Sequence, residues 1–314
     1  MSSLPSPPDG VTFKLRLSKV HLAILALVFG ALGTSVVPLF VRLSEVGPSS
    51  TAFFRPLLAL PLLWLWMVWE RRSSVKKEGG QPQRRPKWRD ILRFAIAGLA
   101  LSCDLSFWHR AILNTTIANA SFLGNLSPIF VALLAWLIFR QKISGLFVMG
   151  LCVAVCGAIL LMGSGFSLEA AGLKGDMLAV SAGFFYAIYL LTLGRARAGF
   201  STAVTMFWTS VFSCLGFLVG AILAQETMLP QTLDGWLILV GLALSAQIIG
   251  LGLITFAFAH LPSSFASVVL FSQPVLSVLV ARIFIYEPTS LLQVAGCGVI
   301  LAGIYVARLG TKFS

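Results

Sequence analysis

The sequence predicts an all-α membrane protein in which ten transmembrane helices form two inverted five-helix repeats. Composition, the lengths of the apolar runs and an internal repeat lead to this fold class. Of 314 residues, 58% are hydrophobic and 11% are charged, and the mean hydropathy is +0.92. An ordinary soluble domain carries about a quarter charged residues, so this chain cannot cover itself with a water-facing surface. The composition therefore excludes soluble enzymes, nucleic-acid binders and disordered scaffolds.

Ten apolar runs are long enough to cross a bilayer, whose core of about 30 Å needs roughly 20 residues per helix. In chain order they cover residues 21–41, 50–69, 91–111, 116–139, 144–162, 175–194, 201–223, 234–259, 263–285 and 289–308. Turn residues or charges separate them, as at Gly47-Pro48, Arg140-Gln141-Lys142 and Leu261-Pro262. The first run is as long as a full span and lacks a cleavage-site pattern, so we expect a retained helix rather than a signal peptide.

The basic residues predict the orientation. With a cytoplasmic N-terminus, 17 Lys and Arg residues fall in cytoplasmic segments, and the opposite side holds only Arg42, Arg110 and Lys174. Eight of the 17 belong to the segment 70–90, which we expect to be a flexible loop. Because cytoplasmic loops are enriched in Lys and Arg, the net charge of +12 indicates topology rather than nucleic-acid binding. We therefore expect an inner (plasma) membrane protein whose tails, 1–20 and 309–314, are both cytoplasmic.

A shift of 146 residues aligns the second half of the chain with the first without a gap. Pro128 then falls on Pro274, Gly150 on Gly296, and Gly157 on Gly303. The repeats are 21–162 and 175–308, joined by a loop at 163–174. Because five spans is an odd number, the second repeat is expected to be inverted, an architecture by which secondary transporters obtain alternating access.

Several segments resemble one known family. Phe54-Arg55-Pro56-Leu57-Leu58-Ala59 is similar to its "fR…la" signature, the stretches 111–128 and 257–274 are similar to its helix-pair motif, and Tyr286-Glu287 with Gly296 and Gly303 is similar to its ending. Over nearly the whole chain the sequence resembles the drug/metabolite transporter (DMT) superfamily, EamA-like branch. The resemblance implies ten helices, a central cavity and, usually, export of amino acids or small metabolites. Two residues depart from the family pattern: Gln141 stands where an acid is usual, and Phe29 stands where Trp is typical.

The two repeated prolines, Pro128 and Pro274, fall well inside spans. A proline there removes a backbone donor, and a broken helix at membrane depth is tolerated only inside protein or beside a watery cavity. The residues before the prolines are polar for a span: Asn119, Ser121 and Asn125 in one copy, Ser267 and Gln273 in the other. We predict two gating helices that line the substrate pathway. The alternative is that these side chains only bond across helix contacts.

Asp104 is the only carboxylate deep inside a predicted span. Ionised in hydrocarbon it would cost about 2.5–3.5 kcal/mol even on the lenient insertion scale, so it must face protein or water. Arg55 is expected at a similar depth on the preceding helix, which makes an ion pair one interpretation. The other is that Asp104 titrates, or binds a substrate amine, and so couples transport to protons.

Aromatic and polar groups on other spans extend the predicted pathway. Trp108 follows Asp104 by one helical turn, Tyr186 and Tyr189 share a face, and Gln247 adds a polar group. His109 is either a proton relay or a structural residue near the outer face. The aromatic residues either line a cavity or simply pack.

The glycine pairs give helices 144–162 and 289–308 small faces, which suit a scaffold or a dimer contact.

No cluster of catalytic or metal-ligating residues and no nucleotide-binding motif is found in the sequence, so neither an enzyme nor a cofactor is expected. The sequence predicts a secondary transporter that exports a small amphipathic metabolite such as an amino acid. An importer or facilitator of another organic solute is the alternative. The expected partners are a small-molecule substrate and the lipid bilayer, without nucleic acid, and the protein is expected to be a monomer or homodimer.

Overall fold

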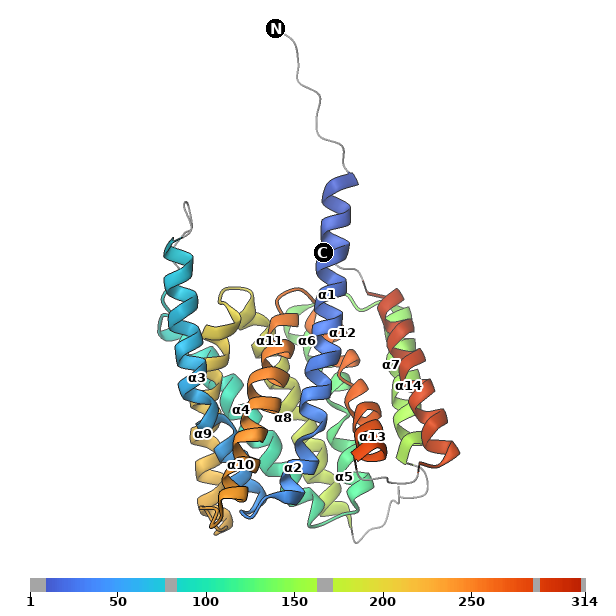
Figure 1. The fold of residues 1–314 in the computed structure, drawn as a ribbon. Coiled ribbons are helices and arrows are strands. Elements are labelled where there is room, and N and C mark those ends of the chain that lie inside the picture. The colour runs from blue at the N-terminus through green and yellow to red at the C-terminus, as the bar shows by residue number, and fades with distance from the viewer. Residues whose placement is uncertain (1–9, 77–83, 163–171, 285–288, 312–314) are drawn as a thin grey trace.

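The protein is a helical bundle in a computed structural model that describes residues 10–76, 84–162, 172–284 and 289–311 (Figure 1). Its elements are α1 (Gly10–Ser35), α2 (Val37–Leu43), α3 (Pro48–Lys76), α4 (Trp88–Ile112), α5 (Ile117–Gly124), α6 (Ser127–Phe139), α7 (Gly145–Met162), α8 (Leu173–Arg197), α9 (Thr202–Ala224), α10 (Leu233–Leu242), the π-helical segment η3 (Ala243–Gly250), α11 (Leu251–Ala257), α12 (Ser263–Val269), α13 (Ser272–Phe284) and α14 (Leu291–Leu309). Within the described ranges no strand is present, so the all-α prediction is confirmed.

Ten helical stretches are long and apolar enough to cross a membrane, as predicted. Six of these spans are single helices: α3, α4, α7, α8, α9 and α14. The other four are compound: α1 with α2, α5 with α6, α10 with η3 and α11, and α12 with α13. Numbered in chain order, spans 1–5 form the first half and spans 6–10 the second.

Two segments are more helical than the sequence suggests. The segment 70–90, expected to be a loop, begins with helix, because α3 continues to Lys76, and its last residues open α4. Likewise α1 begins at Gly10, inside the segment expected to be a tail. These helices extend beyond the predicted spans because hydrophobic length marks where a helix leaves the hydrocarbon, not where its backbone hydrogen bonds end. Tyr286 and Glu287 lie outside the described residues.

The main helix contacts in one half correspond to those in the other, as expected for two structurally equivalent halves. Span 5 packs on span 10, span 2 on span 7, and span 4 on span 9. Span 3 packs on spans 6 and 7, and correspondingly span 8 packs on spans 1 and 2. Span 4 packs on span 6, and span 9 on span 1. Each of these contacts maps onto itself or onto another of them when a span is replaced by its equivalent five spans away.

The repeated glycines lie at the contact between α7 and α14. A Cβ built on Gly150 would stand 2.7 Å from the Gly303 carbonyl oxygen, and one on Gly296 would stand 2.9 Å from the Gly157 carbonyl oxygen. The two backbones therefore approach too closely for a side chain, as in other small-residue helix contacts in membranes. These glycine faces cover one another within a single chain, which makes the pair a scaffold.

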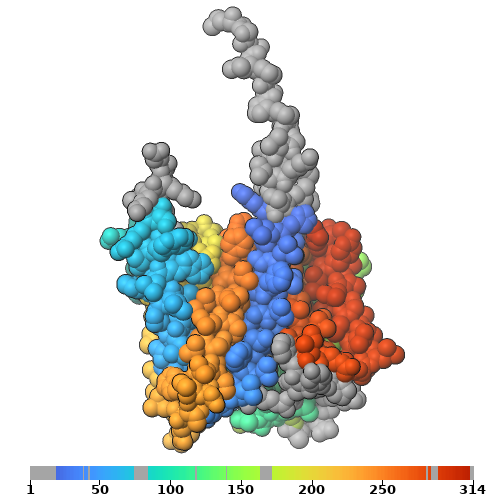
Figure 2. All heavy atoms as spheres, in the orientation of Figure 1, coloured from blue at the N-terminus to red at the C-terminus, as the bar shows by residue number. Residues whose placement is uncertain are grey.

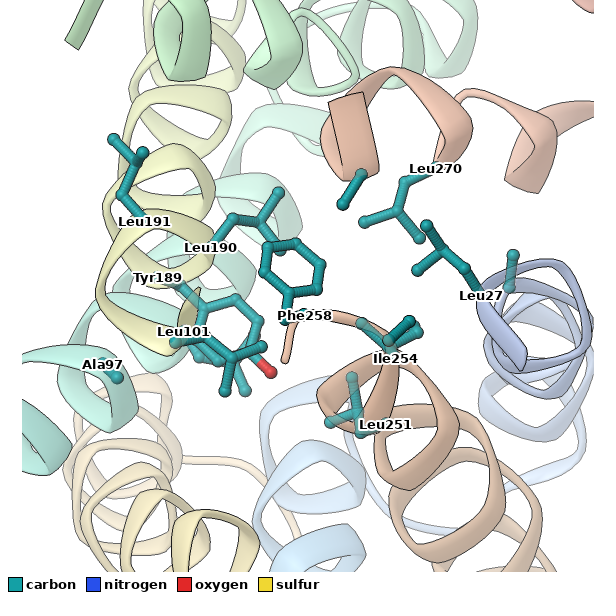
Figure 3. Close-up of a cluster of buried hydrophobic side chains, with 14 of the residues drawn as sticks. Leu27, Ala97, Leu101, Tyr189, Leu190, Leu191, Leu251, Ile254, Phe258 and Leu270 are labelled. Atoms are coloured by element: carbon teal, nitrogen blue, oxygen red, sulfur yellow. The ribbon is translucent and has the colours of Figure 1, made fainter. Parts of the chain in front are cut away.

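The main hydrophobic core lies between the two halves. Leu27 of α1, Leu101 of α4, Leu190 of α8 and Ile254 of α11 are buried there, and Figure 3 shows them pointing toward a common centre. On the outside, large apolar side chains face the surroundings, as expected for helices that lipid covers. In Figure 2 the surface of α11 lies directly against that of α1.

The start of α1 and the end of α14 lie at one end of the bundle (Figure 1). This end, which we call the cationic end, also carries the connections around Arg84, Arg140 and Arg197. The opposite end carries the connections 44–47, 113–116 and 225–232. Four acidic residues, Glu45, Asp176, Glu226 and Asp234, lie in or next to the connections at that opposite end.

Candidate functional site

Arg55 is a buried cation in the interior of the bundle. It lies on the second turn of α3 and is 6% exposed, with its guanidinium 6.0 Å from the centre of the Phe217 ring on α9. Its Nε has no hydrogen-bond partner. A buried, incompletely paired guanidinium is costly in a protein interior and marks a candidate binding group.

Asp104 of α4 is half-buried and within electrostatic range of Arg55. No oxygen of Asp104 lies within 4.0 Å of an Arg55 nitrogen, so within the described residues these two groups form no salt bridge. The two groups therefore interact electrostatically without a direct ion pair. This arrangement suits recognition of a ligand that carries both charges.

Tyr186 and Tyr189 bring the second half of the chain to these charges. Both lie on α8, with ring centroids 5.8 Å apart, and both are within electrostatic range of Arg55 and Asp104. Figure 3 shows Tyr189 projecting from α8 toward the centre of the bundle. The cluster of Arg55, Asp104, Tyr186 and Tyr189, which we call the central cluster, therefore draws on both halves.

Gln273 joins the central cluster to spans 1 and 9. Its side chain interacts with Tyr186, and its Nε2 donates to the Thr34 hydroxyl at 2.7 Å. The Ser35 hydroxyl lies 3.2 Å from the Gln273 carbonyl oxygen. Sequence reasoning missed Thr34 and Ser35; the signal that could have found them is two adjacent hydroxyls at the end of an apolar helix.

Gln247 lies on η3, a rare π-helical stretch of a type often found at functional sites. It is 2% exposed, and its Nε2 donates to the Ser210 hydroxyl of α9 at 2.9 Å. Its Oε1 has no partner. Span 8 therefore also places a buried amide with an unused acceptor inside the bundle.

The two repeated prolines lie where spans 4 and 9 break. Pro128 falls in the first turn of α6, after α5 has ended at Gly124. Pro274 falls in the first turn of α13, after α12 has ended at Val269. Both spans are therefore pairs of short helices, as expected where a proline removes a backbone donor.

Trp108 and His109 lie near the opposite end of α4. Their rings are in contact, with centroids 5.6 Å apart, and both side chains are half-buried. Trp108 also lies beside Gly124, where a Cβ would stand 3.2 Å from its ring. His109 is within electrostatic range of both Glu226 and Arg55.

The remaining predicted pathway residues bond to nearby helix ends. Asn119 is 1% exposed, and its Nδ2 donates to Asp176 of α8 at 3.1 Å. Asn125 donates to the Ser121 carbonyl oxygen at 2.7 Å, and the Ser267 hydroxyl donates to the Ser264 carbonyl oxygen at 2.8 Å. Within the described residues, these hydrogen bonds of Asn125 and Ser267 stay within their own spans and do not reach the central cluster.

Two glutamates clasp the antiparallel pair α3 and α9 at both ends. At the opposite end, Oε2 of Glu226 accepts from the backbone N–H groups of Ser49 (2.8 Å) and Ser50 (3.0 Å), where α3 begins. At the cationic end, Oε2 of Glu70 accepts from the hydroxyl of Ser201 (2.7 Å), the N-cap of α9. Each glutamate thus holds the N-terminus of the other helix, where a negative charge is favoured.

A third glutamate reinforces the opposite end. Oε2 of Glu45 accepts from the backbone N–H groups of Gln231 (2.9 Å) and Thr232 (3.2 Å), and the Thr232 hydroxyl donates to its Oε1. The hydrogen bond from the Thr232 hydroxyl, joined by those two backbone bonds and opposed by burial, holds the pKa of Glu45 below its ordinary value. Sequence reasoning missed all three glutamates, because their partners are about 130–190 residues away in the chain.

Two hollows open at the cationic end. One, of about 670 Å³, is lined by Trp136, Leu137, Arg140, Gln141, Lys142 and Ile143. The other, of about 310 Å³, is lined by Arg84 and residues 197–201. Within the described residues no group of His, Cys, Asp and Glu could hold a metal ion.

Comparisons with known proteins agree with this architecture. The EamA-like transporter family model matches residues 18–163 and again residues 173–309. An uncharacterized transporter of Archaeoglobus fulgidus is 26% identical over 296 residues, covering 92% of this chain and 97% of its own. The uncharacterized transporter YxxF of Bacillus subtilis is 24% identical, covering 91% of this chain and 87% of its own. One solved crystal structure has the same fold, with a TM-score of 0.73 at 19% identity, covering 91% of this chain and 96% of its own. The chain therefore belongs to the EamA-like transporter family and is a multi-pass membrane transporter.

Proposed function

We propose that this transporter exports a small amphipathic metabolite that carries both a carboxylate and an amine, such as an amino acid or a related compound. The central cluster carries the proposal. Arg55 supplies a guanidinium suited to a carboxylate, Asp104 supplies an acceptor suited to an ammonium group, and the tyrosine rings supply an apolar face.

Alternating access between the two halves is the mechanism that we propose. Its support is the exchange symmetry of the helix contacts and the paired broken spans around Pro128 and Pro274. The clasps of Glu226 and Glu70 lie at the two ends of one helix pair, so opening one while the other stays closed would expose the interior to one side at a time. We infer that these clasps are the two gates.

The basic residues support a plasma (inner) membrane orientation with both termini in the cytoplasm, which makes the cationic end cytoplasmic. An impermeant maleimide should then label a single cysteine placed at Gln225 in intact cells. The same reagent should label one placed at Arg72 only after permeabilisation. The reverse pattern would overturn the orientation.

The test of substrate class is counterflow in proteoliposomes, using labelled amino acids and organic amines with and without a pH gradient. We expect saturable exchange of a zwitterion, and loss of exchange in Asp104→Asn and Arg55→Gln. Asp234→Asn, which removes an exposed carboxylate outside the cluster, is the matched control and should transport normally.

The outcomes separate the candidate functions. If Asp104→Asn kept its full pH-dependent flux, Asp104 would have no role in proton coupling or in amine recognition. Exchange of organic amines or acids but of no zwitterion would favour the alternative, a carrier of another organic solute. Net uptake driven by the physiological gradient would indicate an importer.

A further inference from the structure

We propose that the hollow at the end of α6 binds the headgroup of an anionic phospholipid. This hollow, which we call the α6 corner, is lined by Trp136, Leu137, Arg140, Gln141, Lys142 and Ile143 and has a volume of about 670 Å³. It lies where span 4 leaves the hydrocarbon at the cationic end. The proposal concerns the lipid boundary and is independent of the transported substrate.

The charges in the α6 corner have no counter-ion within the described chain. Arg140 and Lys142 are both exposed, and neither has a Glu or Asp oxygen within 4.0 Å among the residues that the structure describes. The residue between them, Gln141, is neutral. Two neighbouring cations at a membrane interface attract acidic headgroups, whose phosphates are suited to Arg and Lys.

The backbone presents these cations in a fixed geometry. Arg140 is the C-cap of α6, with a left-handed φ of 51°, and the N–H groups of Arg140 and Gln141 both bond to the Ala135 carbonyl oxygen. Glycine or asparagine adopts this conformation with less strain, so an arginine here is unexpected on conformational grounds. The following residue outside the hollow, Ser144, donates to the Gly310 carbonyl oxygen at 2.5 Å and ties the connection to α14.

The apolar side of the α6 corner suits the rest of a lipid. Trp136 is 57% exposed and Leu137 is 65% exposed, so both face the surroundings just below the two cations. A tryptophan ring is favoured at the level of the headgroups, and the exposed leucine continues toward the acyl chains. From the interface inward, the α6 corner presents cations, then an indole ring, then an aliphatic side chain. A phospholipid presents its phosphate, glycerol region and acyl chain in the same order.

The internal repeat provides a comparison within the same chain. A shift of 146 residues places Tyr286 at Arg140 and Pro288 at Lys142, with Glu287 at Gln141. The equivalent connection in the second half, which joins spans 9 and 10, therefore lacks both cations. Because α13 ends and α14 begins toward the opposite end, the cationic version is found only where anionic lipid would be expected if the cationic end is cytoplasmic.

The test uses the full-length protein purified from mixed phosphatidylglycerol and phosphatidylcholine and analysed by native mass spectrometry. We expect preferential retention of phosphatidylglycerol, and a reduction of that preference on the order of tenfold in Arg140→Gln/Lys142→Gln. The matched control is Arg85→Gln/Arg89→Gln, which removes two exposed cations at the same end and should keep the preference. If the double variant is not monodisperse, Lys142→Gln alone should show a smaller loss.

Two results would overturn the proposal. Equal phosphatidylglycerol preference in the wild type and in the Arg140 and Lys142 variants would show that the α6 corner is not the site. An equal loss in the Arg85 and Arg89 control would show that net charge alone attracts the lipid. Because retention is measured without substrate, neither result depends on whether the chain transports an amino acid.

Discussion

At the scale of single residues, burial and hydrogen bonding separate two kinds of polar group. Arg55 and Gln247 are buried and each keeps a polar atom without a partner. Asn119 is equally buried, but its amide donates to Asp176, which also accepts from the Thr115 hydroxyl at 2.7 Å. The unpartnered groups are the better candidates for recognition, since a buried polar atom that lacks a partner destabilises the fold unless function uses it.

We therefore expect Asn119→Ala to act on stability rather than on recognition. The change breaks the Asn119–Asp176 hydrogen bond between spans 4 and 6 and should lower the free energy of unfolding by about 1–3 kcal/mol. Thermal unfolding in detergent, together with the KM for counterflow, would measure both effects. An increase of tenfold or more in KM at unchanged stability would instead place Asn119 in the pathway. Ser181→Ala, which removes a bond within one helix, is the control.

At the scale of elements, pairs of helices hold the bundle together by close backbone approach and by contacts at their ends. The glycine faces of α7 and α14 illustrate the first, and the clasps of α3 and α9 the second. The two arrangements have different consequences for motion. A glycine contact buried along a whole helix resists separation, whereas a few hydrogen bonds at a helix end can break and reform.

Gly150→Ala should destabilise the protein by about 1–3 kcal/mol, because its Cβ would stand 2.7 Å from the Gly303 carbonyl oxygen and the backbones would have to move apart. Thermal unfolding in detergent would measure the loss. Gly298→Ala is the matched control, since a Cβ there meets no atom within 4 Å. Equal melting temperatures for the two variants would contradict a tight contact between α7 and α14.

The clasp variants should open the bundle at one end each. Glu226→Ala removes the acceptor for the N–H groups of Ser49 and Ser50, so spin labels at Leu43 and Leu229 should show a broader and longer distance distribution. Glu70→Ala should do the same for labels at Arg72 and Gly199. Each variant is the control for the other, because the far end should be unchanged. Unchanged distributions at both ends would exclude the clasps as gates.

At the scale of the whole molecule, charge is divided between the two ends. The cationic end holds most of the basic residues, while Glu45, Asp176, Glu226 and Asp234 lie in or near the opposite end. The hydrogen bonds that Glu45 accepts at that end, from residues 231 and 232, favour its ionised form. We therefore expect this contact to weaken in acid, when Glu45 becomes protonated.

The pKa of Glu45 is lowered in the folded protein, so the stability contributed by its clasp is present above the ordinary glutamate pKa of 4.5 and is lost as the pH falls through the lowered value. Distances between labels at Leu43 and Leu229 should then broaden below about pH 4. In Glu45→Gln, which keeps a neutral acceptor, this part of the pH response should disappear. An identical response in the variant would assign the transition to another group.

The amino-acid sequence by itself determined the ten spans, the breaks at Pro128 and Pro274, and the family. These follow from local chemistry, since hydrophobic length, proline geometry and short motifs need no knowledge of the partner helix. The tertiary structure decided which faces meet. It placed Gly150 against Gly303 and brought Glu70 to Ser201. It also left Arg55 and Asp104 more than 4.0 Å apart, without a direct ion pair.

The physical reason is the solvent. In a soluble protein, an apolar stripe along a helix shows which face is buried. In lipid the exposed face is as apolar as the buried one, so hydrophobic periodicity does not show how a helix is rotated in the bundle. The α7 helix is hydrophobic on all sides, and only its glycines mark the face that meets α14. The contacts that define the central cluster and the clasps join residues far apart in the chain, and they exist only once every span has its rotation and depth.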